Sequence, residues 1–371
     1  MKELIKKLIS VKTRRKILTF LNRFWVRLCG LLPLKDRVLF YTIRADGSLA
    51  GNAAAVYDAL DCKKLIFAHK LEHSNLLKVK AYRLILTSKV IVTDDYCRYM
   101  RALKLRDGQR LIQIWHGCGA FKRFGLDADY YLSADEEKRA HSQYSAVAVT
   151  GSECIEPYAG AFGIDRSVVL PLGMPETDIL INSPQTLREK FYSSYPELSG
   201  KTLFVYCPTF RETGGVTEHF NPGIDWDKLS EELGENEVFI ISRHPLEPAA
   251  FTEKNYPNIK DMTSVPTTEL LSVASVHITD YSSTVYEATL LGVPTVFYCP
   301  DLEKYNRGFY IRFPDDLPGD VCENPGELLG MIRKAKEKPP VSRMEKFRNG
   351  QLSACDGHST ERIAELIRSW L

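Results

Sequence analysis

The sequence lacks the features of several protein classes. Its nine cysteines are scattered and contain no C-x-x-C pair, which argues against a disulfide framework and a structural zinc site. The longest charge-free apolar stretch near the start covers residues 28–34, too short for a membrane span and poorly shaped for a signal peptide. No internal repeat or G-x-x-x-x-G-K-[ST] phosphate loop is present. These absences favour a globular protein of a reducing compartment.

The sequence does contain an enzyme-like composition and an uneven charge. The 371 residues are 44% hydrophobic and 26% charged, and this length favours two domains. Residues 1–37 hold 11 Lys and Arg against two acidic residues, a local charge of +9, so the other 334 residues carry −7 within the net charge of +2. The basic charge therefore belongs to one N-terminal arm.

This arm, residues 1–36, has the pattern of an amphipathic helix. Its apolar positions recur at helical spacing and include Trp25, while Arg14, Arg15 and Lys16 populate other faces. Cations beside an aromatic apolar face are typical of a helix that lies on an anionic membrane surface. The alternative is a helix that packs on the protein's own body. A nucleic-acid-binding arm is disfavoured, because no nucleic-acid motif follows.

From residue 37 onward, β-branched runs alternate with helical patterns, which predicts parallel sheets flanked by helices. We expect an α/β fold of two Rossmann-like domains, 37–172 and 201–371, joined by a proline-containing hinge at 173–200. The expected strands are 38–42, 65–68, 89–93, 111–115, 146–150 and 168–170, then 202–207, 237–242, 258–262, 276–279 and 295–298, and helices are expected at 52–60, 76–86, 134–142 and 153–162.

Ligands of open α/β sheets bind beyond the carboxyl ends of the strands, so the residues that follow each strand are candidates for a site. His116 follows the strand at 111–115 and precedes Gly117, Gly119 and Lys122. An imidazole there can accept a proton from a hydroxyl near neutral pH, and glycines let a substrate approach the backbone. The alternative is a histidine that makes only structural hydrogen bonds.

Two strand ends of the second series carry cationic side chains. Thr209 and Arg211 follow the strand at 202–207. Arg243 and His244 follow the strand at 237–242. Guanidinium, hydroxyl and imidazole groups are donors suited to phosphate oxygens. An interdomain salt bridge explains Arg211 equally well, and a surface loop explains the other pair.

The segment 277–298 is the most informative. It predicts a strand, a polar turn with Ser282 and Ser283, a helix that ends at Gly292, and another strand. The serines and the first N–H groups of that helix form an anion site reinforced by the helix dipole. Glu287 lies one turn further on the same face, where a carboxylate can accept hydrogen bonds from ribose hydroxyls. N-capping alone explains the serines but not Glu287.

Other arrangements carry less weight. Asp94 and Asp95 after a strand could suggest a metal, but they do not form a D-x-D pair and are equally well explained as capping groups. Cys118 has no dyad partner at a readable spacing, so a thiol nucleophile is disfavoured. The sequence therefore predicts no metal site and requires no cofactor, and it leaves a need for a divalent metal open.

Taken in order, these segments resemble the CDP-glycerol glycerophosphotransferase family, the wall teichoic acid and capsule enzymes of Gram-positive bacteria. The resemblance covers about residues 37–325 and rests on ADGSLAGN, VIVTDDY, QIWHGCGAFKRFG, LGMPETD, YCPTFRE, RHP, ITDYSSTVYEATLLGVPTVFY and DLEKYNRGFY. It implies a glycosyltransferase-B-like fold, with the nucleotide in the C-terminal domain and the acceptor in the N-terminal one.

The resemblance also implies roles for individual residues. His116 matches the position of the catalytic base, Glu287 the position that faces the nucleotide ribose, and Asp280 a supporting position. Arg211, His244, Ser282 and Ser283 match positions linked to the diphosphate, and the residue pattern adds Thr209 and Arg243 to them. On the acceptor side we expect Asn52, Gly117 and Lys122.

The residue pattern and the resemblance predict one reaction. An acceptor hydroxyl, deprotonated by His116, attacks the β-phosphorus of CDP-glycerol or CDP-ribitol and expels CMP. The resemblance implies an undecaprenyl-diphosphate-linked saccharide or a growing polyol-phosphate chain as acceptor, with glycerol phosphate as the expected transferred group. The chain length resembles the priming enzymes more than the large polymerases.

A lipid-linked acceptor explains the basic arm, because an arm that binds the membrane would hold the protein against such a substrate. We therefore expect a peripheral protein at the cytoplasmic face of the cell membrane, which binds the anionic membrane surface and no nucleic acid. Two alternatives stay open: a nucleotide-sugar glycosyltransferase or epimerase of the same fold, and a non-catalytic membrane-associated binding protein. Release of CMP, and its dependence on His116, distinguishes them.

Overall fold

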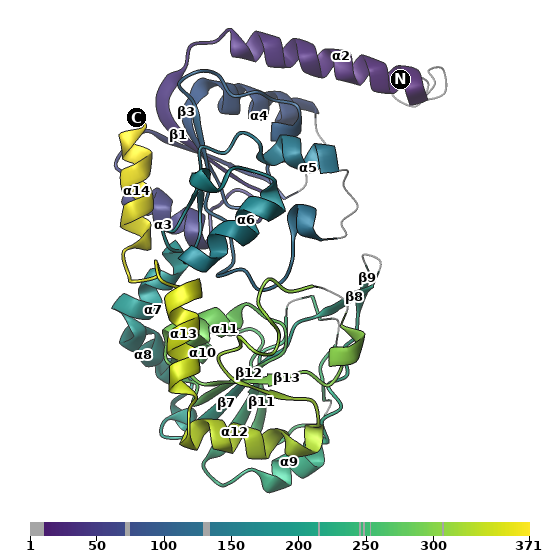
Figure 1. Ribbon diagram of the computed structural model, residues 1–371, viewed down its shortest axis with the longest axis vertical. Helices are drawn as coiled ribbons and strands as arrows, with labels where there is room; N and C mark the ends of the chain where they lie inside the picture. Colours follow the sequence, from purple (N-terminus) through teal and green to yellow (C-terminus); the bar gives the residue numbers. More distant parts are fainter. Residues whose placement is uncertain are drawn as a thin grey trace.

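Two six-stranded parallel sheets, one in each half of the chain, form the framework of the protein (Figure 1). The computed structural model describes residues 11–70, 75–128, 134–213, 216–244, 246–247, 249–252, 254–305 and 308–371. Helices flank the sheets, so the apolar runs of the central strands are covered on both faces. The expected α/β class with two Rossmann-like sheets is confirmed.

The first sheet has the strand order β2-β1-β3-β4-β5-β6. All of the strands and helices expected in this half are present, with ends that differ by a few residues. The strands are β1 (Lys35–Thr42), β2 (Lys64–Ala68), β3 (Ser88–Thr93), β4 (Arg110–Gln113), β5 (Ala146–Ala148) and β6 (Val169–Leu170), and the helices are α3 (Gly51–Ala59), α4 (Asn75–Thr87), α5 (Ala134–His141) and α6 (Ile155–Phe162).

The second sheet has the order β11-β10-β7-β12-β13-β14. Its strands are β7 (Thr202–Cys207), β10 (Glu237–Ile241), β11 (Ile259–Asp261), β12 (Val276–Thr279), β13 (Thr295–Tyr298) and β14 (Asp320–Cys322), and its helices are α9 (Trp226–Glu232), α10 (Thr267–Val273), α11 (Thr284–Leu290) and α12 (Leu328–Glu337). The sequence pattern missed β14 and the hairpin of β8 (Arg211–Thr213) and β9 (Val216–Glu218), because none of these three segments, DVC, RET and VTE, is an apolar run.

The chain crosses between the two sheets again near its C-terminus. Residues 173–200 contain α7 (Asp178–Asn182) and α8 (Pro184–Ser194), while α13 (Val341–Gln351) leads back toward the first sheet. The last helix, α14 (Ser359–Ser369), lies beside α3 (Figure 1). Its Ile363 and Ile367 are buried in the same apolar cluster as Val38 and Phe40 of β1. Residues 359–369, which the sequence assigned to the second domain, therefore contact the first sheet.

The N-terminal arm contains a 20-residue helix, α2 (Val11–Gly30), which packs on α4 at the end of the molecule far from the second sheet (Figure 1). Cys29 is buried and Val26 packs against the core of the first sheet. Phe20, Phe24 and Leu31 are 69%, 52% and 82% exposed. One side of α2 is therefore covered by the protein and another is open. The side chains of Arg14, Arg15 and Lys16 lie outside the described residues.

In the part of the chain that the structure describes, no helix has the length and apolar character to cross a membrane.

Candidate active site

The loop that follows β4 joins the two domains at the carboxyl ends of their strands. Lys122 forms an antiparallel bridge with Phe309, which lies in the segment after β13. The Arg123 N–H donates to the Gly308 carbonyl at 2.8 Å, and the Tyr310 N–H donates to the Phe121 carbonyl at 3.0 Å. The carboxyl ends of both sheets therefore meet at the domain interface, and the side chains that follow the strands gather there.

His116 lies in this loop, directly after β4. Its Nδ1 is 2.8 Å from the Asp94 carbonyl oxygen and 3.5 Å from Oδ2 of Asp95. Because a carbonyl oxygen only accepts, this bond places the proton on Nδ1 and leaves Nε2 as an acceptor. Burial lowers the pKa of His116 below its ordinary value, with a further lowering from the Arg44 cation and an opposing effect of Asp95. The imidazole is therefore neutral at pH 7.

An unusual backbone conformation presents His116. Trp115 has a φ of +50°, and no other non-glycine residue in the described ranges has a positive φ. The strand consequently ends at Gln113, two residues earlier than expected. The Asn52 amide donates to the Trp115 carbonyl at 3.0 Å and accepts from the Glu176 N–H at 2.9 Å. Asn52, expected on the acceptor side, thus holds this turn with both ends of its amide.

The two glycines after His116 have different surroundings. Gly119 has a φ of +65°, and a Cβ on it would lie 2.0 Å from the Tyr286 ring of α11. Nothing lies within 4 Å of a Cβ added to Gly117. Gly119 therefore lets the loop pack against the second domain, whereas Gly117 faces open space beside His116.

Arg211 lies in an ion-pair network of the second domain. Its Nε is 2.7 Å from Oδ2 of Asp301, and its Nη1 is 2.9 Å from Oδ2 of Asp280. Burial by itself would lower the pKa of Arg211. The Asp280 and Asp301 carboxylates raise the pKa by more than burial lowers it, so the net shift is upward. The fully buried Asp280 also accepts from the backbone N–H and the hydroxyl of Thr209, at 2.9 and 2.6 Å. The salt bridge is thus within one domain, and not between domains.

Arg243 and His244 follow β10 and have different partners. Nε of Arg243 is 2.9 Å from Oδ2 of Asp261. Nδ1 of His244 accepts from the Leu246 N–H at 3.1 Å, which leaves the proton on Nε2. Burial lowers the pKa of His244, and the Lys122 cation of the first domain lowers it further. The Lys122 cation of the first domain therefore acts electrostatically on a neutral His244 of the second.

The segment after β12 contains the two serines and Glu287. Ser282 Oγ accepts from the Thr284 N–H at 3.3 Å, while Ser283, the first residue before α11, makes no side-chain capping bond. Glu287 lies near Cys118 and Glu176, and burial raises the pKa of Glu287 to about 7. Its Oε2 is buried and has no hydrogen-bond partner among the described residues. An unsatisfied buried carboxylate oxygen is costly, which favours a ligand that donates to it.

Sequence reasoning missed three residues of this arrangement: Arg44, Asp95 and Asp301. Asp95 was weighed only as a metal ligand or capping group, and no cluster of metal-ligating side chains occurs in the described part of the chain. The available signal was that β3 and β4 could be neighbours, because VIVTDDY would then lie beside QIWHG. Asp301 follows β13 and was visible only as part of a motif of the resemblance.

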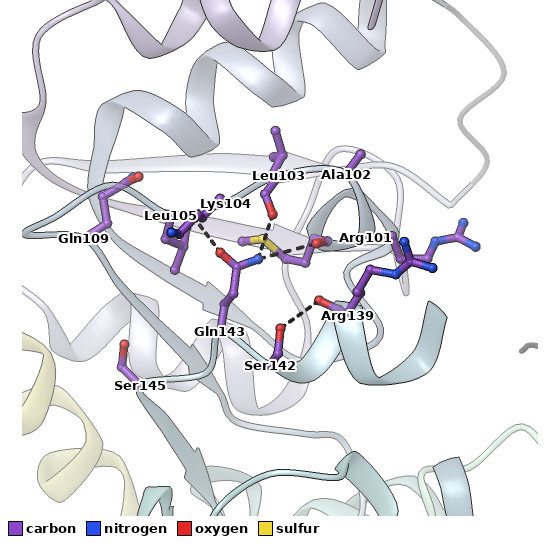
Figure 2. Close-up of a pocket in the computed structure, with 11 residues that line it drawn as sticks. Arg101, Ala102, Leu103, Lys104, Leu105, Gln109, Arg139, Ser142, Gln143 and Ser145 are labelled. Carbon is purple, nitrogen blue, oxygen red and sulfur yellow. Dashed lines mark hydrogen bonds between the residues drawn. The ribbon is translucent and has the colours of Figure 1, made fainter. Parts of the chain in front are cut away.

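A pocket of about 610 Å³ lies elsewhere, beside α5. It is lined among others by Arg101, Lys104 and Arg139 (Figure 2). Gln109 and Ser145 at its edge directly precede β4 and β5. The pocket therefore lies at the amino ends of these strands, opposite to His116, and the Gln143 amide crosses it with bonds to Leu103 and Leu105. We do not assign the chemistry to this hollow.

Two parallel-sheet domains with opposed carboxyl ends, and with the candidate side chains gathered between them, define a protein of glycosyltransferase-B-like architecture. Within that class the sequence is specific. The chain belongs to the CDP-Glycerol:Poly(glycerophosphate) glycerophosphotransferase family, which it matches over residues 27–369.

Comparison with individual proteins agrees with this membership. The chain is 32% identical over 368 residues to the teichoic acid ribitol-phosphate primase of Bacillus spizizenii, covering 93% of this chain and 94% of that protein. The structure of the wall teichoic acid polymerase TagF superimposes with a TM-score of 0.77 at 22% identity, over 97% of this chain and 98% of that one. A UDP-GlcNAc 2-epimerase from Neisseria meningitidis shares the fold with a TM-score of 0.58 at 11% identity, over 90% of this chain and 100% of that one. The chain is thus a member of a family of teichoic acid polyol-phosphate transferases.

Proposed function

We propose that this protein transfers a polyol phosphate from a CDP-polyol to a hydroxyl of a lipid-linked saccharide and releases CMP. The observation that carries the proposal is the neutral His116 at the domain interface, whose Nδ1 is engaged and whose Nε2 is left as an acceptor. Metal dependence is not part of the proposal.

The chemical step follows from that arrangement. Nε2 of His116 takes the proton of the acceptor hydroxyl while its oxygen forms a bond to the β-phosphorus of the donor. The bond between the β-phosphorus and the bridging oxygen breaks, and CMP leaves with that electron pair. The Asp95 carboxylate, 3.5 Å from Nδ1, stabilises the imidazolium that forms.

The second domain holds the donor. Ser282, Ser283 and the neutral His244 donate hydrogen bonds to the diphosphate, and Lys122 supplies positive charge from the first domain. Glu287 accepts from the ribose hydroxyls, which is supported by its unpartnered Oε2.

Supporting residues keep these groups in place. The ion pairs of Arg211 with Asp280 and Asp301 order the loops after β7, β12 and β13, and Thr209 is held by Asp280. Arg243 ties the loop after β10 to Asp261 at the end of β11. These contacts support a positioning role for the arginines, through which they shape the diphosphate site.

For the donor we place CDP-ribitol first and CDP-glycerol second. The sequence motifs do not distinguish the two donors, and glycerol phosphate was expected only from the family resemblance, but a ribitol-phosphate primase matches this chain over 94% of its own length. The same match supports priming rather than polymerisation. For the acceptor we keep the two classes that the family resemblance implies, an undecaprenyl-diphosphate-linked saccharide or a growing polyol-phosphate chain.

Such an acceptor lies in a membrane, and α2 offers a surface for it. Its exposed Phe20, Phe24 and Leu31 and the basic residues of the arm support binding to an anionic bilayer. We propose that the protein is peripheral and acts at the cytoplasmic face of the cell membrane.

The test is CMP release from CDP-ribitol and CDP-glycerol, with a synthetic prenyl-diphosphate disaccharide as acceptor. We expect acceptor-dependent release from one donor and its loss in His116→Ala, by about 10²–10⁴-fold. His358→Ala, which removes an exposed histidine before α14, is the matched control and keeps full activity. Turnover of UDP- or GDP-sugars without CMP release would replace the proposal with a glycosyltransferase or epimerase, and full activity of His116→Ala would remove the base.

A further inference from the structure

Arg44 lies beside His116, although the sequence motifs did not single it out. It follows β1, and β1, β3 and β4 are neighbours in the first sheet. Arg44, Asp95 and His116 therefore stand at the carboxyl ends of three adjacent strands. The Arg44 side chain is 45% exposed, and its backbone N–H donates to the Thr42 hydroxyl at 3.1 Å.

The guanidinium of Arg44 makes a long ion pair with Asp95. Its Nη1 is 3.8 Å from Oδ2 of Asp95, beyond hydrogen-bond distance, and within the described ranges its side chain donates no hydrogen bond. Arg211 offers the contrast, since its donors are engaged by Asp301, Asp280 and Thr209. An arginine presents five donors in a planar fork, so Arg44 has capacity for a ligand.

The charge of Arg44 acts on the groups around the proposed base. The Arg44 cation contributes a lowering to the pKa of His116 in the loop after β4, of Asp94 in the loop after β3, and of Glu176 in the hinge. Burial dominates all three shifts, but the common contribution of Arg44 places its guanidinium among these segments. The same Oδ2 of Asp95 lies 3.8 Å from Nη1 of Arg44 and 3.5 Å from Nδ1 of His116, so Arg44 brings a cation close to the imidazole.

We propose that Arg44 binds the phosphate of an acceptor that already ends in a polyol phosphate, next to the hydroxyl that His116 deprotonates. This inference rests on the proposed function and assigns a specificity-determining residue to one of the two acceptor classes that the family resemblance implies. The donor diphosphate is assigned to side chains of the second domain together with Lys122, so an anion that reaches Arg44 belongs to the acceptor. Each transfer leaves a phosphodiester one polyol away from the next free hydroxyl, and a guanidinium fork can bind its two free oxygens together.

A purely structural role of Arg44 makes a different prediction. If Arg44 only balances the charge of Asp95, its removal changes the orientation and the pKa of His116 for every acceptor alike. If it binds a phosphate, its removal affects only acceptors that carry one. Two acceptors that differ in this group therefore separate the two roles.

The experiment compares wild type with Arg44→Gln on a prenyl-diphosphate disaccharide with and without a terminal glycerol phosphate. We expect KM for the phosphate-bearing acceptor to rise about tenfold or more in the variant, with kcat changed less than about threefold, and KM for the other acceptor to stay constant. Arg44→Lys restores part of the affinity. Arg139→Gln removes an exposed cation at the opposite end of the same sheet and leaves both KM values unchanged. Equal effects on both acceptors, or an unchanged KM, would overturn the assignment.

Direct binding separates this inference from the proposed function. A soluble disaccharide with a terminal glycerol phosphate is titrated into wild type and Arg44→Gln by calorimetry, beside its dephosphorylated form. Weaker binding by about tenfold in the variant, only for the phosphorylated form, supports Arg44 even if no CDP-polyol is turned over. Identical affinities in the two proteins would refute the role of Arg44, and CMP release in wild type would then still support the transferase.

Discussion

Oδ2 of Asp95 lies 3.5 Å from Nδ1 of His116, although the two residues come from different strand ends. The pairing follows from the adjacency of β3 and β4, which brings the loops after both strands together. The Asp94 carbonyl accepts from the same Nδ1, so the imidazole is held in one tautomer and one orientation. This arrangement suits a base that becomes charged during turnover.

The first prediction concerns this pair. A base must be neutral to accept a proton, so kcat/KM falls as the pH drops through the pKa of His116, which burial holds below its ordinary value. Asp95 opposes that lowering, so Asp95→Asn moves the acid limb to lower pH and reduces kcat by about 10–10²-fold. The pH profile of CMP release measures both effects. Asp107→Asn, at an exposed carboxylate, should keep the wild-type profile. An acid limb that stays in place would separate Asp95 from the base.

The second prediction compares the two glycines after His116. Gly119→Ala puts a methyl group against the Tyr286 ring at a φ of +65°. We therefore expect the free energy of unfolding to fall by about 2–4 kcal/mol and the contact between the loop and α11 to be lost. Gly117→Ala has open space and should change stability by less than about 1 kcal/mol. Denaturant unfolding of both variants is the measurement. Equal stability of the two would contradict the packing of the loop on the second domain.

The third prediction concerns Glu287, whose pKa burial raises from 4.5 to about 7. The folded state then binds more protons than the unfolded state between these values, so this group's contribution to stability falls as the pH rises through that window. Glu287→Gln removes this pH dependence. The free energy of unfolding of the variant minus that of wild type should therefore be about 1–3 kcal/mol larger at pH 8 than at pH 5. It should also bind the CDP-polyol about tenfold more weakly, through loss of the ribose contact.

Chemical unfolding at both pH values and calorimetric titration of the nucleotide check these two outcomes. Glu323→Gln, at an exposed carboxylate, is the control and should show neither change. A stability difference between Glu287→Gln and wild type that is independent of pH would show that the Glu287 carboxylate is not the group that titrates in this window.

The fourth prediction concerns the exposed side of α2. Deleting the whole arm would also remove the buried Cys29, so a surface variant is the sharper test. Phe20→Ser combined with Phe24→Ser removes two side chains that are 69% and 52% exposed, and we expect it to reduce co-sedimentation with anionic vesicles by about tenfold or more without loss of stability. Val341→Ser, at a 53% exposed position in the second domain, should sediment like wild type. Full sedimentation of the double variant would leave α2 without a membrane role.

Much of the fold could be predicted from the sequence, because parallel strands that are covered on both faces consist of continuous apolar residues. Val38 to Tyr41 and Leu203 to Cys207 are such runs, and their strands lie where they were expected. His116, Arg211, His244 and Ser283 were found for the same reason, since each follows a strand whose end is visible locally. Their individual roles stay predictions.

What the sequence alone determined is the set of elements and the residues at their ends, because these depend on patterns within about ten positions of the chain. Only the tertiary structure decided which of these residues contact one another. The pairing of Asp95 with His116 needs β3 beside β4, the partner of Arg211 is Asp301 ninety positions away, and α14 closes on the first sheet rather than the second. Strand order and side-chain contact are set by the packing of the whole chain, and no local pattern encodes them.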